Sequence, residues 1–143
     1  MLYYQSGSEN TVIGRNDLEY GLYSALAKLG PKKKVLVVPP DFTRFHSRSG
    51  DITTLIYKYY KSDLKDILPA LGTHVPMTDD EIAQMYKDVP RELFRVHDWR
   101  KDVVTVGTVP GEFVSKLTNG AVDYSWPAQL NSLVFNGGHD LII

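Results

Sequence analysis

The chain has 143 residues, of which 43% are hydrophobic, and a formal net charge of −1. This length suits one domain with a buried core, and the near-neutral charge gives no electrostatic reason to bind nucleic acid. The absence of cysteine excludes disulfides, thiolate metal sites and thiol nucleophiles. No run of about 18 apolar residues predicts a membrane span, and the N-terminus lacks a secretion signal. We therefore expect a cytoplasmic domain with no membrane or nucleic-acid partner.

The first predicted helix begins at Asn16, because Glu19 three residues later is typical of a capping box. Gly30 and the proline after it are expected to end the helix. One face carries regularly spaced leucines: Leu18, Leu22, Leu26 and Leu29. The apolar run over residues 35–40 then predicts a buried strand, which ends in the polar cluster Asp41-Phe42-Thr43-Arg44.

A polar loop is predicted over residues 45–50, followed by an amphipathic helix capped by Ser49 or Asp51. A second apolar run over residues 67–71 predicts the next strand, which ends in Gly72-Thr73-His74. Helical patterns follow both runs, so we interpret them as neighbouring strands of a parallel sheet.

A further capping box, Thr78-Asp79-Asp80-Glu81, predicts a helix that ends near Pro90. Residues 93–97 form a possible third strand, and the alternating pattern over residues 103–109 predicts a fourth. The alternation of strands and helices is therefore regular as far as Pro90.

The segment 110–120 favours a short helix with a glycine stop, although Asn119-Gly120 could instead form a hairpin turn. Residues 128–135 suit another helix, and residues 140–143 begin a buried strand. Together these signals predict one α/β unit, with a mainly parallel sheet and helices on both faces in a Rossmann-like three-layer arrangement. The last strand stops early, so we expect a fold truncated at its C-terminal end.

Polar side chains beyond the carboxyl ends of parallel strands share one crevice, which is where ligands bind in such sheets. The planar guanidinium of Arg44 can hold a carboxylate through two parallel hydrogen bonds. His74, with an ordinary pKa of about 6.5, can take a proton from a substrate and return it. Asp41 could orient His74 or a substrate hydroxyl, or it could close its own turn through local hydrogen bonds. Both interpretations of Asp41 stay open.

The other histidines suggest no function by themselves. His46 and His97 lie in predicted loops that could line the cleft, although His46 and Arg48 could equally form a solvent-facing loop. His139 is expected to cap a turn. No spacing of the His-x-x-x-His type occurs, so the chain predicts no metal site of its own.

The segment Asp41-Phe42-Thr43-Arg44, followed by residues 72–81, resembles the N-terminal region of the nickel-pincer-dependent lactate racemase family. The resemblance implies two α/β domains with the active site between them, and a nickel-bearing pyridinium mononucleotide held by a lysine and further ligands. It also implies that a histidine removes the substrate hydroxyl proton while the carbon-bound hydrogen passes as hydride to the cofactor. The hydride then returns to the other face of the resulting 2-keto acid, which completes racemisation.

By the same resemblance, His74 corresponds to one of two catalytic histidines and Arg44 to the arginine that holds the substrate carboxylate. Asp41 corresponds to the aspartate beside that arginine. Thr43 and Thr73 correspond to cleft-lining residues on the cofactor side.

The resemblance covers nearly the whole chain, but only about the first third of a family enzyme. The second histidine, the cofactor-tethering lysine, the nickel-ligating histidine and the second domain lie beyond Ile143 in the family pattern. Residues 1–143 are therefore expected to form the N-terminal portion of the N-terminal domain, which alone would not hold the nickel-pincer nucleotide stably. Phe45 stands where proline is usual and Val75 where arginine is frequent, so the identity of the 2-hydroxy acid stays open.

Three hypotheses follow. The first is an N-terminal fragment of a racemase or epimerase of lactate or a related 2-hydroxy acid, inactive alone because its C-terminal portion is missing. The second is a non-catalytic α/β module that binds a carboxylate through Arg44. The third is one half of a split assembly.

Overall fold

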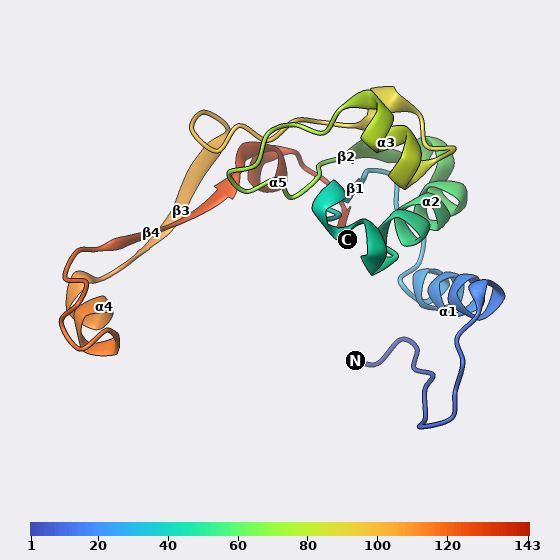
Figure 1. The fold of residues 1–143 in the computed structure, drawn as a ribbon, viewed down its shortest axis with the longest axis horizontal. Helices are drawn as coiled ribbons and strands as arrows, with labels where there is room; N and C mark the ends of the chain where they lie inside the picture. Colours follow the sequence, from blue (N-terminus) through green and yellow to red (C-terminus); the bar gives the residue numbers. More distant parts are fainter. The chain divides into compact units, whose positions relative to one another are not determined.

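The computed structural model describes residues 1–143 and divides into two compact units, one of residues 1–96 with 139–143 and the other of residues 97–138. The first unit contains α1 (Arg15–Lys28), β1 (Val35–Val37), α2 (Ser49–Tyr60), β2 (Leu64–Ile67), α3 (Asp79–Tyr86) and β5 (Leu141–Ile142) (Figure 1). It also contains the 3-10 turns η1 (Phe42–Ser47), η2 (Lys61–Asp63) and η3 (Arg91–Leu93). The second unit contains β3 (Val103–Val109), α4 (Gly111–Leu117), β4 (Trp126–Asn131) and α5 (Ser132–Asn136). None of these helices is of a length and apolarity that would carry it through a membrane.

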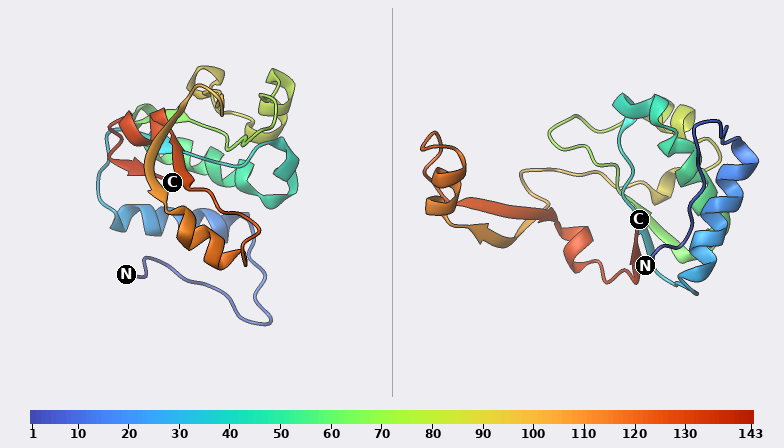
Figure 2. Two further views of the ribbon diagram at one scale, coloured as in Figure 1. Left: turned by 90° about the vertical axis from the view of Figure 1, so that its left-hand side faces the viewer. Right: turned by 90° about the horizontal axis from the view of Figure 1, so that it is seen from below.

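The first unit is built on a three-stranded parallel sheet in the order β2-β1-β5. Val35 of β1 is level with Leu64 of β2 on one side and with Leu141 of β5 on the other. The C-terminal strand therefore lies beside β1, although most of the chain separates them in sequence (Figure 2). This arrangement confirms the α/β prediction and is consistent with a Rossmann-like fold.

The core of this unit forms where the helices meet the sheet. All three residues of β1 are buried, which is typical of a strand covered on both faces. Val35 and Val37 point to one face because side chains alternate along a strand. They share a cluster with buried side chains of all three helices of the unit, namely Leu26, Ile56, Tyr60, Ile82, Met85 and Tyr86.

The predicted starts of two helices were wrong. The first helix begins at Arg15, because the backbone amide of Gly14 donates to the carboxylate of Asp17 (2.9 Å) in place of the expected pairing of Asn16 with Glu19. Residues 45–47 of the predicted loop belong to η1, and residues 49–50 belong to α2, which begins directly after Arg48 in its left-handed conformation (φ 66°). Ser49 and Asp51 therefore lie inside the helix instead of capping it.

The second strand lies earlier than predicted, at Leu64–Ile67 instead of residues 67–71. Two of its four residues are charged, so the segment lacks the apolar pattern that predicts a buried strand. Lys65 is exposed, but Asp66 is buried. Beyond it only one bridge joins Pro40 to Ala70, because a proline has no N–H to continue a ladder. The third strand predicted over residues 93–97 is also wrong, because η3 leads into a single bridge from Phe94 to β2.

In the second unit, β3 and the short helix α4 are confirmed, and positive φ angles at Asn119 (52°) and Gly120 (81°) follow the helix. The helix predicted over residues 128–135 was wrong for its first half, which is β4, and correct for its second half, which is α5. Here β3 and β4 form an antiparallel pair, separate from the parallel sheet. No residue of 97–138 is buried, so this unit has no core of its own.

Candidate functional site

The site lies where the chain leaves β1 and β2. After β1, Asp41 caps the start of η1, and its carboxylate accepts hydrogen bonds from the amide (3.1 Å) and the hydroxyl (2.5 Å) of Thr43. After β2, a turn closes when the amide of His74 donates to the carbonyl of Leu71 (2.9 Å). The two turns bring Asp41 Oδ2 and His74 Nδ1 to 2.6 Å, although the residues are 33 positions apart.

This pairing determines which nitrogen of the neutral imidazole carries the proton. Asp41 is only 5% exposed, and burial raises the pKa of its carboxyl. The hydrogen bonds from Thr43 and His74 outweigh burial, so the pKa of Asp41 lies below its ordinary value and the group is ionised near neutral pH. An ionised carboxylate only accepts hydrogen bonds, so His74 Nδ1 carries the proton. In the neutral form of the ring the lone pair is therefore on Nε2, and the ring is half exposed, so a substrate can reach that nitrogen.

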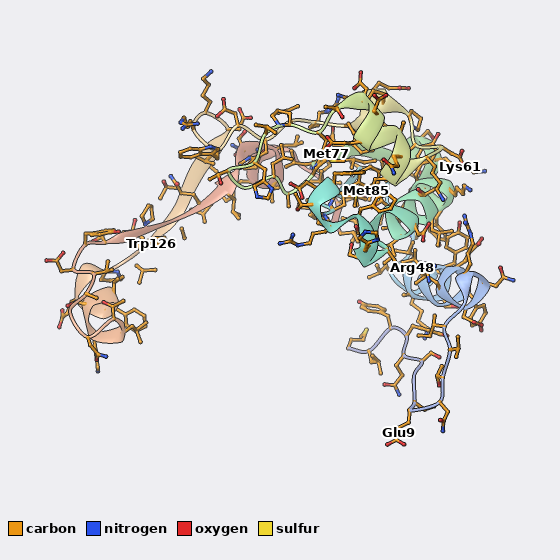
Figure 3. All side chains as sticks on the ribbon, in the orientation of Figure 1. Glu9, Arg48, Lys61, Met77, Met85 and Trp126 are labelled. Carbon is orange, nitrogen blue, oxygen red and sulfur yellow. The ribbon has the colours of Figure 1, made fainter.

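A cavity of about 200 Å³ adjoins the pair. It is lined by Asp41, Phe42, Thr43, His74, Val75, Pro76, Met77 and Glu81. Met77, labelled in Figure 3, is a buried residue of this wall. The carboxylate of Glu81 accepts from the amide (2.8 Å) and the hydroxyl (3.1 Å) of Thr78, so it is held as the cap of α3. The cavity thus combines an apolar wall with one acid/base pair.

Arg44 lies at the rim of the site and does not line the cavity. Its Nη1 donates to the hydroxyl of Thr43 (3.3 Å), which in turn donates to Asp41. A hydrogen-bonded series thus runs from Arg44 through Thr43 and Asp41 to His74. Arg44 is exposed and forms no ion pair with the chain, so its guanidinium is available to a ligand. Thr73 is also exposed, but it does not line the cavity.

The structure adds one residue that sequence reasoning missed. The hydroxyl of Tyr86 in α3 donates to the carbonyl of Pro40 (2.7 Å), directly before Asp41. The residue is fully buried, and burial, with a smaller effect of the Asp41 charge, raises the pKa of its hydroxyl. Tyr86 therefore stays protonated and fixes the turn that carries Asp41. Its place in an amphipathic helix predicted burial, but nothing in the sequence signalled the hydroxyl's partner.

None of the remaining histidines lines this cavity. His46 and Arg48 border another cavity, of about 270 Å³. His97 Nδ1 lies 2.8 Å from the side-chain nitrogen of Asn131 within the second unit. The prediction that His139 caps a turn was wrong, because its buried ring places Nε2 2.9 Å from the carboxylate of Asp66 and its Nδ1 has no hydrogen-bond partner. This contact helps to fasten the segment before β5 to β2.

No protein-family model matches the chain, and a search of curated proteins also finds no match. Two solved structures are similar. A protein from Thermotoga maritima shares 30% identity over 90% of this chain, with a TM-score of 0.76, and 32% of that protein is covered. The lactate racemase apoprotein from Thermoanaerobacterium thermosaccharolyticum shares 23% identity over 94% of this chain, with a TM-score of 0.54, and 28% of it is covered. The chain thus spans about a third of the length of these proteins, and the likeness to the racemase shows a shared fold.

Proposed function

We propose that this chain supplies the substrate-binding and proton-transferring N-terminal part of a racemase or epimerase that acts on lactate or a related 2-hydroxy acid. The observation that carries the proposal is the 2.6 Å pairing of Asp41 with His74, which leaves an unprotonated imidazole nitrogen beside a cavity. The fold shared with a lactate racemase apoprotein supports the same class of reaction.

In this proposal each group of the series has one task. Arg44 holds the substrate carboxylate through its planar fork of donors. His74 Nε2 then accepts the proton of the 2-hydroxyl group as the C2–O bond gains carbonyl character, and it later returns that proton. Asp41 keeps the opposite nitrogen protonated and stabilises the imidazolium, while Thr43 holds the carboxylate of Asp41 in place.

The hydrogen on C2 needs a hydride acceptor, for which the family resemblance implies a nickel-pincer nucleotide. The residues described here do not fit that group, because no set of three or more histidine, aspartate or glutamate side chains could hold a metal ion and no lysine lines the cavity. We propose instead that the cofactor and a second acid/base residue belong to a further, C-terminal portion of the same enzyme.

Binding of L-lactate and of propionate to the intact chain tests the proposal, because propionate lacks only the hydroxyl. A hydrogen bond from this hydroxyl to His74 predicts that lactate binds about threefold to tenfold more tightly. In His74→Phe this preference should vanish while propionate affinity stays the same. Arg44→Gln should weaken both ligands, whereas the control Arg100→Gln should weaken neither.

A second outcome would favour the alternative of a non-catalytic carboxylate-binding module, which the exposed and unpaired Arg44 allows. In that case Arg44→Gln would weaken both acids, but lactate and propionate would bind equally and His74→Phe would change neither affinity. If Arg44→Gln changed no affinity at all, both hypotheses would fail.

A further inference from the structure

The helix α1 has an aromatic face that its role in the core does not require. Residues of α1 and one residue of α2 line an open cavity of about 670 Å³. They are Asn16, Glu19, Tyr20, Tyr23, Ser24, Ala27 and Tyr59. A helix at a protein surface usually has charged residues on its outer face. Here two tyrosines and a single carboxylate of α1 line the cavity together with one tyrosine of α2.

The tyrosine rings present accessible π-surfaces. Tyr23 and Tyr59 lie 5.1 Å apart between ring centroids with an interplanar angle of 55°, so α1 and α2 each contribute one ring to a tilted pair. Tyr59 is 36% exposed and Tyr20 is 69% exposed. An aromatic ring carries negative potential on its face, which attracts cations. The cavity therefore offers several such faces to one ligand.

The cavity is lined by one charged side chain, which is negative. Glu19 is the only charged lining residue, and it takes part in no ion pair of the chain. The lysines on the same two helices are engaged elsewhere, since Lys28 donates to the carbonyl of Tyr3 (2.6 Å) and Lys58 pairs with Asp88 (3.5 Å). Burial, with a smaller effect of Glu19, also raises the pKa of Tyr23, which keeps its hydroxyl neutral. No lysine or arginine lines the cavity.

We propose that the tyrosine-lined cavity binds a small organic cation of the alkylammonium class, with the cation over the rings of Tyr20, Tyr23 and Tyr59 and with Glu19 as its counterion. Aromatic faces and a nearby carboxylate suit a quaternary ammonium in particular, because such a cation is weakly hydrated and makes no hydrogen bonds that the site would have to supply. The proposal is independent of the reaction proposed for the Asp41 site.

Choline and its neutral carbon isostere, 3,3-dimethylbutan-1-ol, provide a matched pair of probes for the intact chain. Nuclear magnetic resonance titration would follow the ring signals of Tyr20, Tyr23 and Tyr59. We expect choline to shift these signals with a dissociation constant of about 1–10 mM, and the isostere to bind about fivefold more weakly. Glu19→Gln should lower choline affinity about fivefold and leave the isostere unchanged, whereas the control Glu112→Gln, in α4, should alter neither.

The titrations distinguish a cation site from an apolar surface and from the absence of any site. Equal affinities for choline and the isostere, with no effect of Glu19→Gln, would identify an apolar surface and overturn the cation site. An absence of choline-induced shifts at all three tyrosines would overturn the site altogether. Unperturbed backbone spectra of Glu19→Gln would show that any loss of binding comes from the missing charge. A second variant, Tyr20→Ala, should also weaken choline binding, because this ring is largely exposed and removable without loss of core packing.

Discussion

Replacing Asp41 by asparagine should invert the protonation of His74. The amide oxygen of Asn can still accept from the amide and hydroxyl of Thr43, so its NH₂ group is left facing His74 Nδ1. That nitrogen must then become the acceptor, which moves the ring proton to Nε2 and removes the lone pair proposed as the base. Nitrogen-15 chemical shifts of the His74 ring distinguish the two tautomers directly. We expect the Nδ1–H form in the wild-type chain and the Nε2–H form in Asp41→Asn.

The same substitution has a cost in stability that can be worked from the contacts. The carboxylate charge spreads over both oxygens, so all three bonds to residue 41 lose a charged acceptor, and the 2.6 Å bond to His74 changes most because its direction also reverses. Hydrogen bonds to charged groups contribute about 1.5–3 kcal/mol, but the imidazole is half exposed, so solvent reduces this to about 1–2 kcal/mol. Thermal unfolding followed by circular dichroism should show a Tm lower by about 3–8 °C. The control Asp88→Asn, at an exposed carboxylate, should change Tm little.

The pH dependence of this difference has a defined sign. The pKa of Asp41 is lowered in the folded state, so its charge stabilises the fold above the unfolded pKa of about 3.9. That contribution is lost as the pH falls through the lower, folded-state pKa. The stability gap between wild type and Asp41→Asn should therefore be full near neutral pH and should narrow in acid. If the stability difference stayed constant down to strongly acidic pH, the Asp41 charge would not stabilise the fold. If the His74 tautomer were unchanged in Asp41→Asn, the carboxylate would not orient the ring.

Three further predictions concern the scaffold. Gly50→Ala should destabilise the fold by about 1–3 kcal/mol in urea unfolding, because the added Cβ would lie 2.2 Å from the carbonyl oxygen of Met85. Gly107→Ala, with open space around the new methyl group, serves as its control and should have little effect. Tyr86→Phe removes the donor to the Pro40 carbonyl and should cost about 0.5–1.5 kcal/mol in the same assay, and no loss would argue against its positioning role. In hydrogen exchange, the amides of β3 and β4 should exchange faster than those of β1, and equal protection would contradict a second unit without a core.

Much of the fold could be predicted from local sequence signals. The apolar run at β1 is uninterrupted, and the Thr78 capping box forms as expected at the start of α3. Alternating residues predicted β3 for the same reason, since side-chain period is a local property. Elements whose character depends on distant partners could not be predicted. In β2, for example, Asp66 is buried and bonded to Arg95 and His139, which are far from it in sequence. A local pattern gives no sign that such a charged residue belongs to a buried strand.

For the candidate site, too, the features that follow from sheet topology could be predicted and those that depend on packing could not. Placing Asp41 and His74 at neighbouring strand ends required only the topology of a parallel sheet, and the structure brings their side chains into contact. The two interpretations of Asp41 prove compatible, because one oxygen closes the turn at Thr43 and the other binds the imidazole. The link from Tyr86 to Pro40 depends on the packing of α3 against η1, which no local pattern encodes.

The most direct test of the central claim is the position of a bound 2-hydroxy acid. Isotope-filtered nuclear Overhauser spectra of carbon-13-labelled lactate with the intact chain would show which protons lie near its C2–H group. We expect contacts to the His74 ring and to Val75 in the cavity wall, and we expect Arg44→Gln to abolish them. Contacts confined to other surfaces of the chain, or contacts that persist unchanged in Arg44→Gln, would contradict it.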